Sequence, residues 1–260
     1  MAEKVAERVA EMRALGVRWG ERTVLDAVDL RLLAGERLVV VGPSGAGKST
    51  ILRLLAGLQL PTSGELFIHG EPQTYLRLDQ RHPPDVRLVF QNPALLASLT
   101  VRENVGFLLY RYSRLPDAEI QRRVSRALEA VGLYGIEDRL PGELSGGMQK
   151  RVGIARAIAM NPKYLFCDEP NSGLDPQTSI VIDELIKELT QEFNTTTIVI
   201  THDMNSVMET GENIIFVHNG RMWWSGTREE LLYSDNEELN AFIFASEVMR
   251  VVKRSLARKP

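Results

Sequence analysis

The sequence contains the run Gly42-Pro43-Ser44-Gly45-Ala46-Gly47-Lys48-Ser49-Thr50. It fits the pattern glycine, any residues, glycine, lysine, serine that marks a phosphate-binding loop when a strand precedes it and a helix follows. The apolar stretch before it, residues 38–41, is typical of a buried strand. The residues after it, 49–58, have the composition of a helix. A strand, a glycine-rich loop and a helix in this order predict a P-loop fold.

The residue types in this loop suit the phosphates of a nucleotide. Glycines let consecutive backbone N–H groups turn toward an anion, and the N-terminus of the following helix adds partial positive charge. Lys48 can reach the outer phosphates, and the Ser49 hydroxyl can ligate Mg²⁺. We therefore predict that residues 42–50 hold the phosphates of the bound nucleotide.

Length and composition narrow the class of protein. The chain has 260 residues, which favours one compact domain with an appendage. Its net charge of -3 gives no electrostatic reason to expect nucleic acid as a partner. Cys167 is the one cysteine, so no intrachain disulfide is possible, which fits a reducing compartment. The charged first residues do not resemble a signal peptide, and no apolar run is long enough to span a bilayer. If the protein works at a membrane, we expect another chain to supply the span.

Short apolar runs alternate with longer helical patterns, which predicts an α/β fold with a mainly parallel sheet. The predicted strands are Arg37–Val41, Leu66–His69, Val86–Phe90, Tyr164–Cys167, Thr196–Ile200 and Ile214–Val217. The predicted helices are Lys48–Leu58, Pro116–Gly132, Ser145–Met160 and Pro176–Phe193. Residues 91–161 show helical patterning and no convincing strand, so we expect a helical insert there.

Three polar residues follow predicted strands. Asp168 ends one strand, where its carboxylate is placed to hold Mg²⁺, and Glu169 follows on the opposite face, where it can activate the attacking water. His202 follows the strand at residues 196–200 and can bond to the γ-phosphate. A solvated strand end and an ordinary loop histidine are the structural alternatives. The phosphate loop upstream favours the catalytic interpretation.

A second glycine-rich run, Leu144-Ser145-Gly146-Gly147-Met148-Gln149, lies just before a predicted helix. Ser145 suits a helix N-cap, and the glycines allow close approach of a phosphate, so the run is either an ordinary helix start or a second anion site. The chain would then have two phosphate-binding loops but only one set of lysine and magnesium-binding residues. A head-to-tail dimer explains this, with each nucleotide between one copy's phosphate loop and the other copy's Ser145 loop.

These motifs together resemble the ABC transporter ATPases over roughly residues 11–235. The resemblance rests on residues 42–50, the run LSGGMQ at 144–149, the strand and acid pair at 164–169, the run SGLD at 172–175, and His202. It implies a P-loop NTPase core, the helical subdomain at 91–161, and a C-terminal helical extension at 236–260. It also implies that the protein binds ATP with Mg²⁺ and hydrolyses it.

The resemblance assigns further roles by position. Trp19 stands where the family places an aromatic residue that stacks on adenine, and Gln91 where a glutamine touches magnesium and links to the membrane subunits. Ser145, Gly146 and Gly147 would contact the partner copy's ATP, and Asp175 would lie at the dimer seam. Lys48, Gln91, Glu169 and His202 are the expected catalytic residues, and Ser49, Gln91 and Asp168 the expected magnesium ligands.

Among ABC systems, residues 99–105, 128–133 and Met148 are similar to the MCE-type (Mla-like) lipid-transport ATPases. That similarity implies membrane permease subunits, an MCE-domain lipid-binding protein and a small STAS-type regulatory subunit as partners. It also implies a place on the cytoplasmic face of a bacterial inner membrane. Met148 is shared with glycine-betaine importers, so a small-solute importer is the alternative. A soluble ABC protein of translation or DNA repair is the alternative from another class.

The end of the chain predicts a helix from Asn236 to Lys259, with apolar residues spaced along one face and a basic end. The helix either packs on its own domain or the dimer mate, or lies on an anionic membrane surface. We favour packing on protein.

Overall fold

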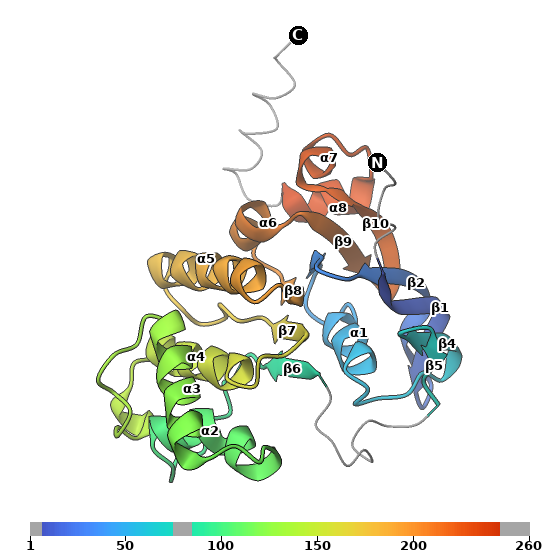
Figure 1. The fold of residues 1–260 in the computed structure, drawn as a ribbon. Helices are drawn as coiled ribbons and strands as arrows, with labels where there is room; N and C mark the ends of the chain where they lie inside the picture. The colour runs from blue at the N-terminus through green and yellow to red at the C-terminus, as the bar shows by residue number, and fades with distance from the viewer. Residues whose placement is uncertain (1–6, 75–84, 245–260) are drawn as a thin grey trace, which may run out of the picture. The chain divides into compact units, whose positions relative to one another are not determined.

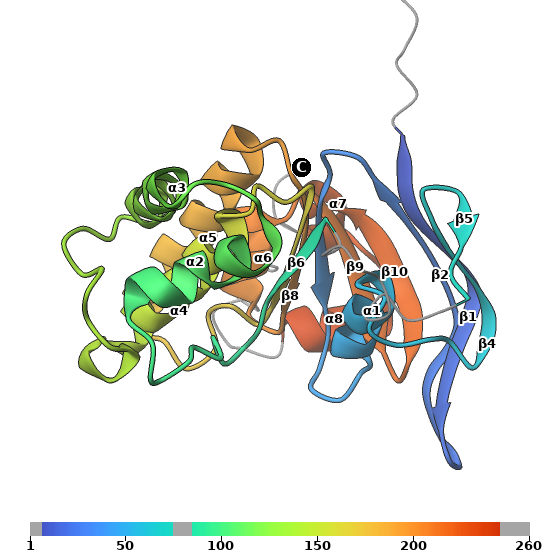
Figure 2. The same ribbon diagram turned by 60° about the horizontal axis from the view of Figure 1, so that its bottom comes forward.

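The computed structural model describes residues 7–74 and 85–244. The chain forms two compact units, which are drawn with their elements in Figures 1 and 2. Unit 1 comprises Met1–Leu76 and Ile200–Pro260, and unit 2 comprises Arg77–Val199.

Unit 1 contains an antiparallel sheet that the sequence patterns did not predict in full. Its strand order is β2-β1-β4-β5, seen side by side in Figure 2. The strands are β1 (Arg8–Trp19), β2 (Arg22–Leu33), β4 (Ser63–Ile68) and β5 (Glu71–Pro72). We predicted no strand over residues 8–33, because charged residues interrupt both stretches. Bulges at the pairings of β1 and β2 also break the alternation of buried and exposed side chains.

The phosphate loop of unit 1 begins at the end of β3 (Arg37–Val41), all of whose residues are buried. β3 pairs in parallel with β9 (Asn213–His218), and β9 pairs antiparallel with β10 (Arg221–Thr227). α1 (Lys48–Leu55) follows the loop and ends before the predicted Leu58, since Gly57 turns the chain at φ 70°. α6 (Met204–Thr210) follows the strand β8 (Thr196–Thr201), and α7 (Arg228–Leu232) follows β10.

Unit 2 contains the predicted strands around the acid pair. β6 (Val86–Val89) and β7 (Tyr164–Asp168) pair in parallel, and β8 (Thr196–Thr201) is the next strand after β7 in the sheet order. These bounds match the predicted strands to within a residue. α5 (Pro176–Glu192) connects β7 to β8 and buries one face, including Ile182, Ile186 and Leu189. An α/β architecture with parallel strand pairs is therefore confirmed.

Residues 92–161, all of which the structure describes, contain helices and no strand. They form α2 (Val101–Tyr112), α3 (Asp117–Ala130), the 3₁₀ turn η2 (Pro141–Glu143) and α4 (Gly146–Ile158), which Figure 1 shows grouped in green. α2, α3 and α4 all contact one another. The predicted helical insert is thus present as a helical cluster, while its limits at 91 and 161 stay a prediction.

The C-terminal helix starts where the sequence predicts. Asn236 caps α8 (Glu237–Ile243) by accepting a hydrogen bond from the Leu239 N–H, and Phe244 is the C-cap. The rest of the predicted helix, through Lys259, lies outside the described residues. Among the helices that the structure describes, none is long and apolar enough to cross a membrane.

Candidate functional site

The phosphate loop wraps around the side chain of Lys48. Lys48 is 5% exposed, and its ammonium donates hydrogen bonds to the carbonyl oxygens of Gly42 at 2.8 Å and Pro43 at 3.0 Å. The loop also closes on itself, because the Ala46 N–H donates to the Pro43 carbonyl at 3.2 Å. An ammonium held by such a loop can bind the outer phosphates of a nucleotide.

Two glycines allow the loop to pass close to neighbouring backbone. A Cβ on Gly42 would fall on the carbonyl oxygen of Val217 in β9. A Cβ on Gly47, whose φ is 103°, would lie 2.9 Å from the carbonyl oxygen of Val24 in β2. Only glycine satisfies these positions without a backbone shift. The cradle therefore has the small residues and the cation that bound phosphates require.

Unit 1 also contains Trp19 and His202, the residues predicted to contact adenine and the γ-phosphate. Trp19 ends β1, and its side chain is 50% exposed, as a stacking surface for a base must be. His202 is the first residue after β8 and is exposed. Asp203, next to it, caps α6 by accepting a hydrogen bond from Asn205 N–H at 2.9 Å. The histidine therefore stands at a junction between a buried strand and a capped helix, and its role stays a prediction.

In unit 2 the acid pair lies where the chain leaves β7. Residues 164–167 are buried, while Asp168 and Glu169 are half-buried. Glu169 has φ 48°, a left-handed conformation that is uncommon for a residue other than glycine. Such strain often accompanies functional sites. The chain then turns, with the Ser172 N–H donating to the Glu169 carbonyl at 3.1 Å.

The structure brings Gln91 to this turn. The Gln91 amide donates to the Ser172 hydroxyl at 2.8 Å, although the two residues are far apart in the sequence. Ser172 belongs to the run SGLD at residues 172–175, and no separate role was predicted for it. A serine in that run has no local signal for this contact, because its partner lies on another element.

The Ser145 loop forms a capped helix start. Ser145 caps α4 by accepting a hydrogen bond from the Met148 N–H at 3.3 Å, as predicted. Gly147 passes close to α5, since a Cβ there would lie 2.8 Å from a methyl carbon of Thr178. Because residues 146 and 147 are glycines, no side chain of their own stands beside the backbone N–H groups at the start of α4. An anion of a partner molecule suits this arrangement.

Asp175 is used within the chain as the N-cap of α5. Its carboxylate accepts hydrogen bonds from the Thr178 hydroxyl at 2.6 Å and the Thr178 N–H at 3.0 Å. These bonds lower the pKa of Asp175. If Asp175 lies at a dimer seam, as predicted, its carboxylate is already oriented by the helix that it caps.

The predicted residues fall into two groups. Residues 42–50, Trp19 and His202 belong to unit 1, and Gln91, Ser145–Gly147, Asp168, Glu169 and Asp175 belong to unit 2. In the described parts of the chain, no cluster of three or more His, Cys, Asp or Glu side chains could hold a metal ion. The predicted magnesium ligands are a hydroxyl, an amide and one carboxylate, so they do not form such a cluster. An ATP-bound Mg²⁺ takes its remaining ligands from phosphates and water.

A family model described as ABC transporter matches residues 25–172 of this chain, which is more than half of it. The chain belongs to the ABC transporter family. It is an ATPase of that family and binds ATP with Mg²⁺.

Two curated relatives are similar to the chain over most of its length. The chain is 38% identical over 261 aligned residues to Protein TRIGALACTOSYLDIACYLGLYCEROL 3, chloroplastic, of Arabidopsis thaliana, covering 94% of this chain and 76% of that protein. It is 41% identical to the Fe(3+) ions import ATP-binding protein FbpC of Photobacterium profundum, covering 82% of this chain and 60% of that protein. The chain thus spans less than two thirds of that FbpC protein.

Solved structures of ABC proteins share the fold. The ATP-binding cassette MJ0796, solved as a dimer in a post-hydrolysis state with ADP and Pi, superposes with a TM-score of 0.74 at 31% identity, over 84% of this chain and 98% of that one. CbiO1 from Clostridium perfringens, part of the ABC transporter complex cbiONQ, superposes with a TM-score of 0.80 at 28% identity, over 95% of this chain and 99% of that one. The expectation of an ABC ATPase is therefore confirmed at the level of family, fold, reaction and nucleotide.

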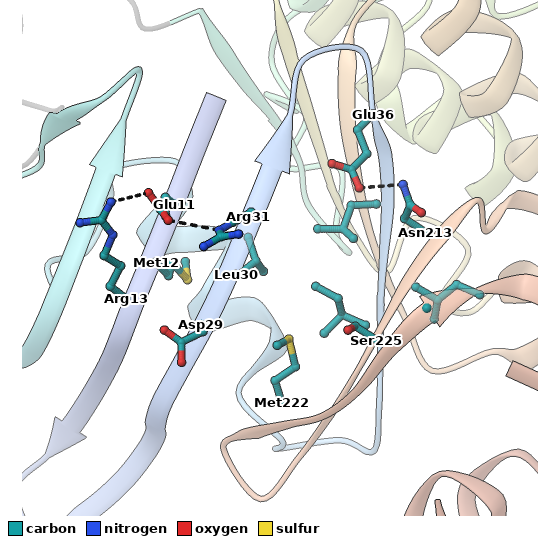
Figure 3. A pocket seen from close by; sticks show the side chains of 14 residues that line it. Glu11, Met12, Arg13, Asp29, Leu30, Arg31, Glu36, Asn213, Met222 and Ser225 are labelled. Atoms are coloured by element: carbon teal, nitrogen blue, oxygen red, sulfur yellow. Dashed lines mark hydrogen bonds and ion pairs between the residues drawn. The ribbon is translucent and has the colours of Figure 1, made fainter. Parts of the chain in front are cut away.

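This ABC protein also has a cavity outside the predicted site. Its volume is about 600 Å³. Figure 3 shows the side chains that line it, which come from β1, β2, β3, β9, β10 and Glu36 of unit 1. Glu11 accepts hydrogen bonds there from Arg13 at 2.8 Å and Arg31 at 3.2 Å, and the bond from Arg13 lowers the pKa of Glu11. Glu36 accepts one from Asn213 at 2.8 Å. The polar groups named here are already paired with one another, and none is a predicted site residue.

Proposed function

We propose that this chain is the ATP-hydrolysing subunit of an ABC transporter and that two copies form the catalytic unit, head to tail. The observation that carries the proposal is the presence of two glycine-rich anion loops in one chain, at residues 42–47 and 145–147, with a single lysine in a phosphate cradle. Each ATP would lie between the phosphate loop of one copy and the Ser145 loop of the other.

In this proposal each residue has a defined task. Lys48 and the backbone of residues 42–47 bind the phosphates, while Ser49, Asp168 and Gln91 ligate Mg²⁺. Glu169 takes the proton of the attacking water, and His202 bonds to the γ-phosphate. Trp19 stacks on adenine. A Mg²⁺ ion held by these residues would neutralise charge on the phosphates during hydrolysis.

The variant Glu169→Gln tests the assignment of the base. The amide keeps the size of the side chain but cannot accept the proton, so ATP hydrolysis should fall about 100-fold or more while ATP binding is kept. Phosphate release and nucleotide titration measure the two effects. Glu188→Gln is a matched control, because Glu188 is an exposed carboxylate on α5. Brisk turnover by Glu169→Gln would rule Glu169 out as the base.

We further propose that the chain binds membrane permease subunits through unit 2. α2 exposes three aromatic side chains, Phe107, Tyr110 and Tyr112, each at least 44% exposed. Exposed aromatic groups on one helix are typical of a protein interface. No helix in the described residues can span a membrane, so attachment at the cytoplasmic face of a bacterial inner membrane would depend on such a partner.

For the transported substrate we propose a lipid. The match to the Arabidopsis protein, whose name contains that of a galactolipid, extends over 94% of this chain. The motifs at residues 99–105 and 128–133 resemble MCE-type systems, whose further partners would be an MCE-domain protein and a STAS-type subunit. Fe(3+) import is the second candidate, because FbpC of Photobacterium profundum is 41% identical to this chain.

Purification of the tagged chain from its source membranes in mild detergent distinguishes the lipid proposal from the iron proposal. A lipid transporter should bring down a permease, an MCE-domain protein and enriched phospholipid, measured by mass spectrometry. Recovery of an iron-binding protein with the permease, and no enriched lipid, would support iron import instead. A Phe107→Asp/Tyr110→Asp variant should lose the permease while keeping its ATP affinity.

A further inference from the structure

Lys150, in the first turns of α4, is a buried cation that no predicted role uses. The residue is 8% exposed, which is rare for lysine. Burial lowers the pKa of Lys150, and the nearby charge of Glu169 opposes that shift. Its ammonium donates a hydrogen bond to the Ser172 carbonyl at 2.7 Å. The bond links α4 to the turn that follows the acid pair.

Ser172 is the point where several contacts of that turn meet. Its N–H donates to the Glu169 carbonyl at 3.1 Å, so Ser172 closes the turn that begins at Glu169. Its hydroxyl accepts the hydrogen bond of the Gln91 amide at 2.8 Å. Its carbonyl accepts the bond from Lys150. Movement of Ser172 would therefore move the backbone that sets the direction of the Glu169 side chain.

The conformation of Glu169 shows why such support is needed. With φ at 48°, the residue costs free energy that surrounding contacts must offset. A charge-assisted hydrogen bond to a carbonyl is stronger than a neutral one, especially where water is excluded. Lys150 supplies that bond from a rigid helix, since residues 152–155 of α4 are all buried.

We propose that Lys150 is a positioning residue for ATP hydrolysis, which holds the Glu169–Ser172 turn so that the Glu169 carboxylate meets the attacking water. This inference rests on the proposed role of Glu169 as the base. Lys150 does not touch the nucleotide in this account. Loss of its bond should therefore lower kcat without changing the affinity for ATP, because a small displacement of a catalytic group has a large effect on rate.

Steady-state kinetics of Lys150→Met tests the proposal. Methionine keeps most of the length and the apolar stem but cannot donate to Ser172. We expect kcat to fall about 10-fold, with KM and the dissociation constant of a fluorescent ATP analogue unchanged. Lys150→Arg, which keeps a charged donor, should recover part of the rate. Lys187→Met removes the same charge from an exposed position on α5 and should behave like the wild type.

The same substitution in the Glu169→Gln background separates positioning from a general structural role. If Lys150 acts through Glu169, Lys150→Met should not lower the small residual rate of that variant any further. An equal loss in both backgrounds, or an unchanged kcat in the single variant, would overturn the proposal. Should Lys150→Met not fold, Lys150→Leu, which also lacks a donor, serves for the same comparison. Full turnover by Glu169→Gln itself would refute the proposed base, and that result is distinct from a failure of Lys150 alone.

Discussion

The loops that carry chemistry in the two units are held in different ways. In unit 1 the phosphate loop is shaped by backbone, with glycines that pass close to carbonyl groups of β2 and β9 and a lysine folded onto its own loop. In unit 2 the loops are tied by side chains from distant elements, such as Gln91 and Lys150 on Ser172. Arg156 of α4 likewise donates to the carbonyls of Pro93 and Ala94, just after Gln91.

This difference suggests that the loops of the two units contribute differently to ATP binding and to hydrolysis. A loop fixed by its own backbone is preformed and can bind phosphates without rearrangement, whereas loops tied by a few long side chains can shift when one contact changes. ATP affinity would then depend chiefly on the phosphate loop of unit 1, and the Glu169–Ser172 turn of unit 2 would govern the rate alone. Substitutions in the phosphate loop should accordingly lower both ATP affinity and hydrolysis, whereas substitutions that loosen the turn should lower only the rate.

The largest effect is expected from Lys48→Ala. In the proposed site the Lys48 ammonium binds the outer phosphates. Without this cation, ATP affinity and hydrolysis should both fall by about 100-fold or more. Nucleotide titration and phosphate release measure the two losses. Lys163→Ala, at an exposed lysine paired with Asp85, is the control. Wild-type ATP affinity in Lys48→Ala would break the comparison, since unit 1 would then not be the binding unit.

A pair of glycine substitutions sharpens the account of the phosphate loop. Gly42→Ala places a methyl group on the Val217 carbonyl and should lower the free energy of unfolding by about 2–4 kcal/mol. Gly45→Ala, at φ 80° with no atom within 4 Å of the added carbon, should cost only about 1 kcal/mol. Urea denaturation of both variants measures the difference. Equal losses would show that close packing against β9 does not shape the loop.

A smaller effect is expected from Asn104→Ala in unit 2. This fully buried side chain accepts a hydrogen bond from the Leu96 N–H and donates to the carbonyls of Leu96, Leu99 and Thr100. Without it, part-buried backbone groups lose their partners around an emptied buried position, and the free energy of unfolding should fall by about 2–3 kcal/mol. Asn92→Ala, which removes one exposed local hydrogen bond from the Ala94 N–H on the same connection, is the comparison and should cost less. An unchanged unfolding midpoint in Asn104→Ala would contradict the view that side chains hold these loops.

The sequence predicted those parts of the structure that depend on local patterns. β3, the phosphate loop, the N-cap at Ser145 and the acid pair at the end of β7 all follow from short runs of residues, and the structure places them as expected. β1 and β2 were missed because bulges and charged residues hide their periodicity. The contacts of Lys150 and Gln91 with Ser172 were missed because they join residues that only the tertiary fold brings together.

The measurement that tests the central claim most directly is ATP-dependent dimerisation of Glu169→Gln, with and without Ser145→Arg. With ATP, Glu169→Gln should change in size-exclusion chromatography from the monomer mass to twice that mass. Glu169→Gln/Ser145→Arg should bind ATP with the same affinity and remain a monomer, because the arginine blocks the second anion loop. Tyr134→Arg, at a 72% exposed position, adds the same charge and should leave the dimer intact. A dimer of Glu169→Gln/Ser145→Arg at the same ATP concentration would contradict the head-to-tail site.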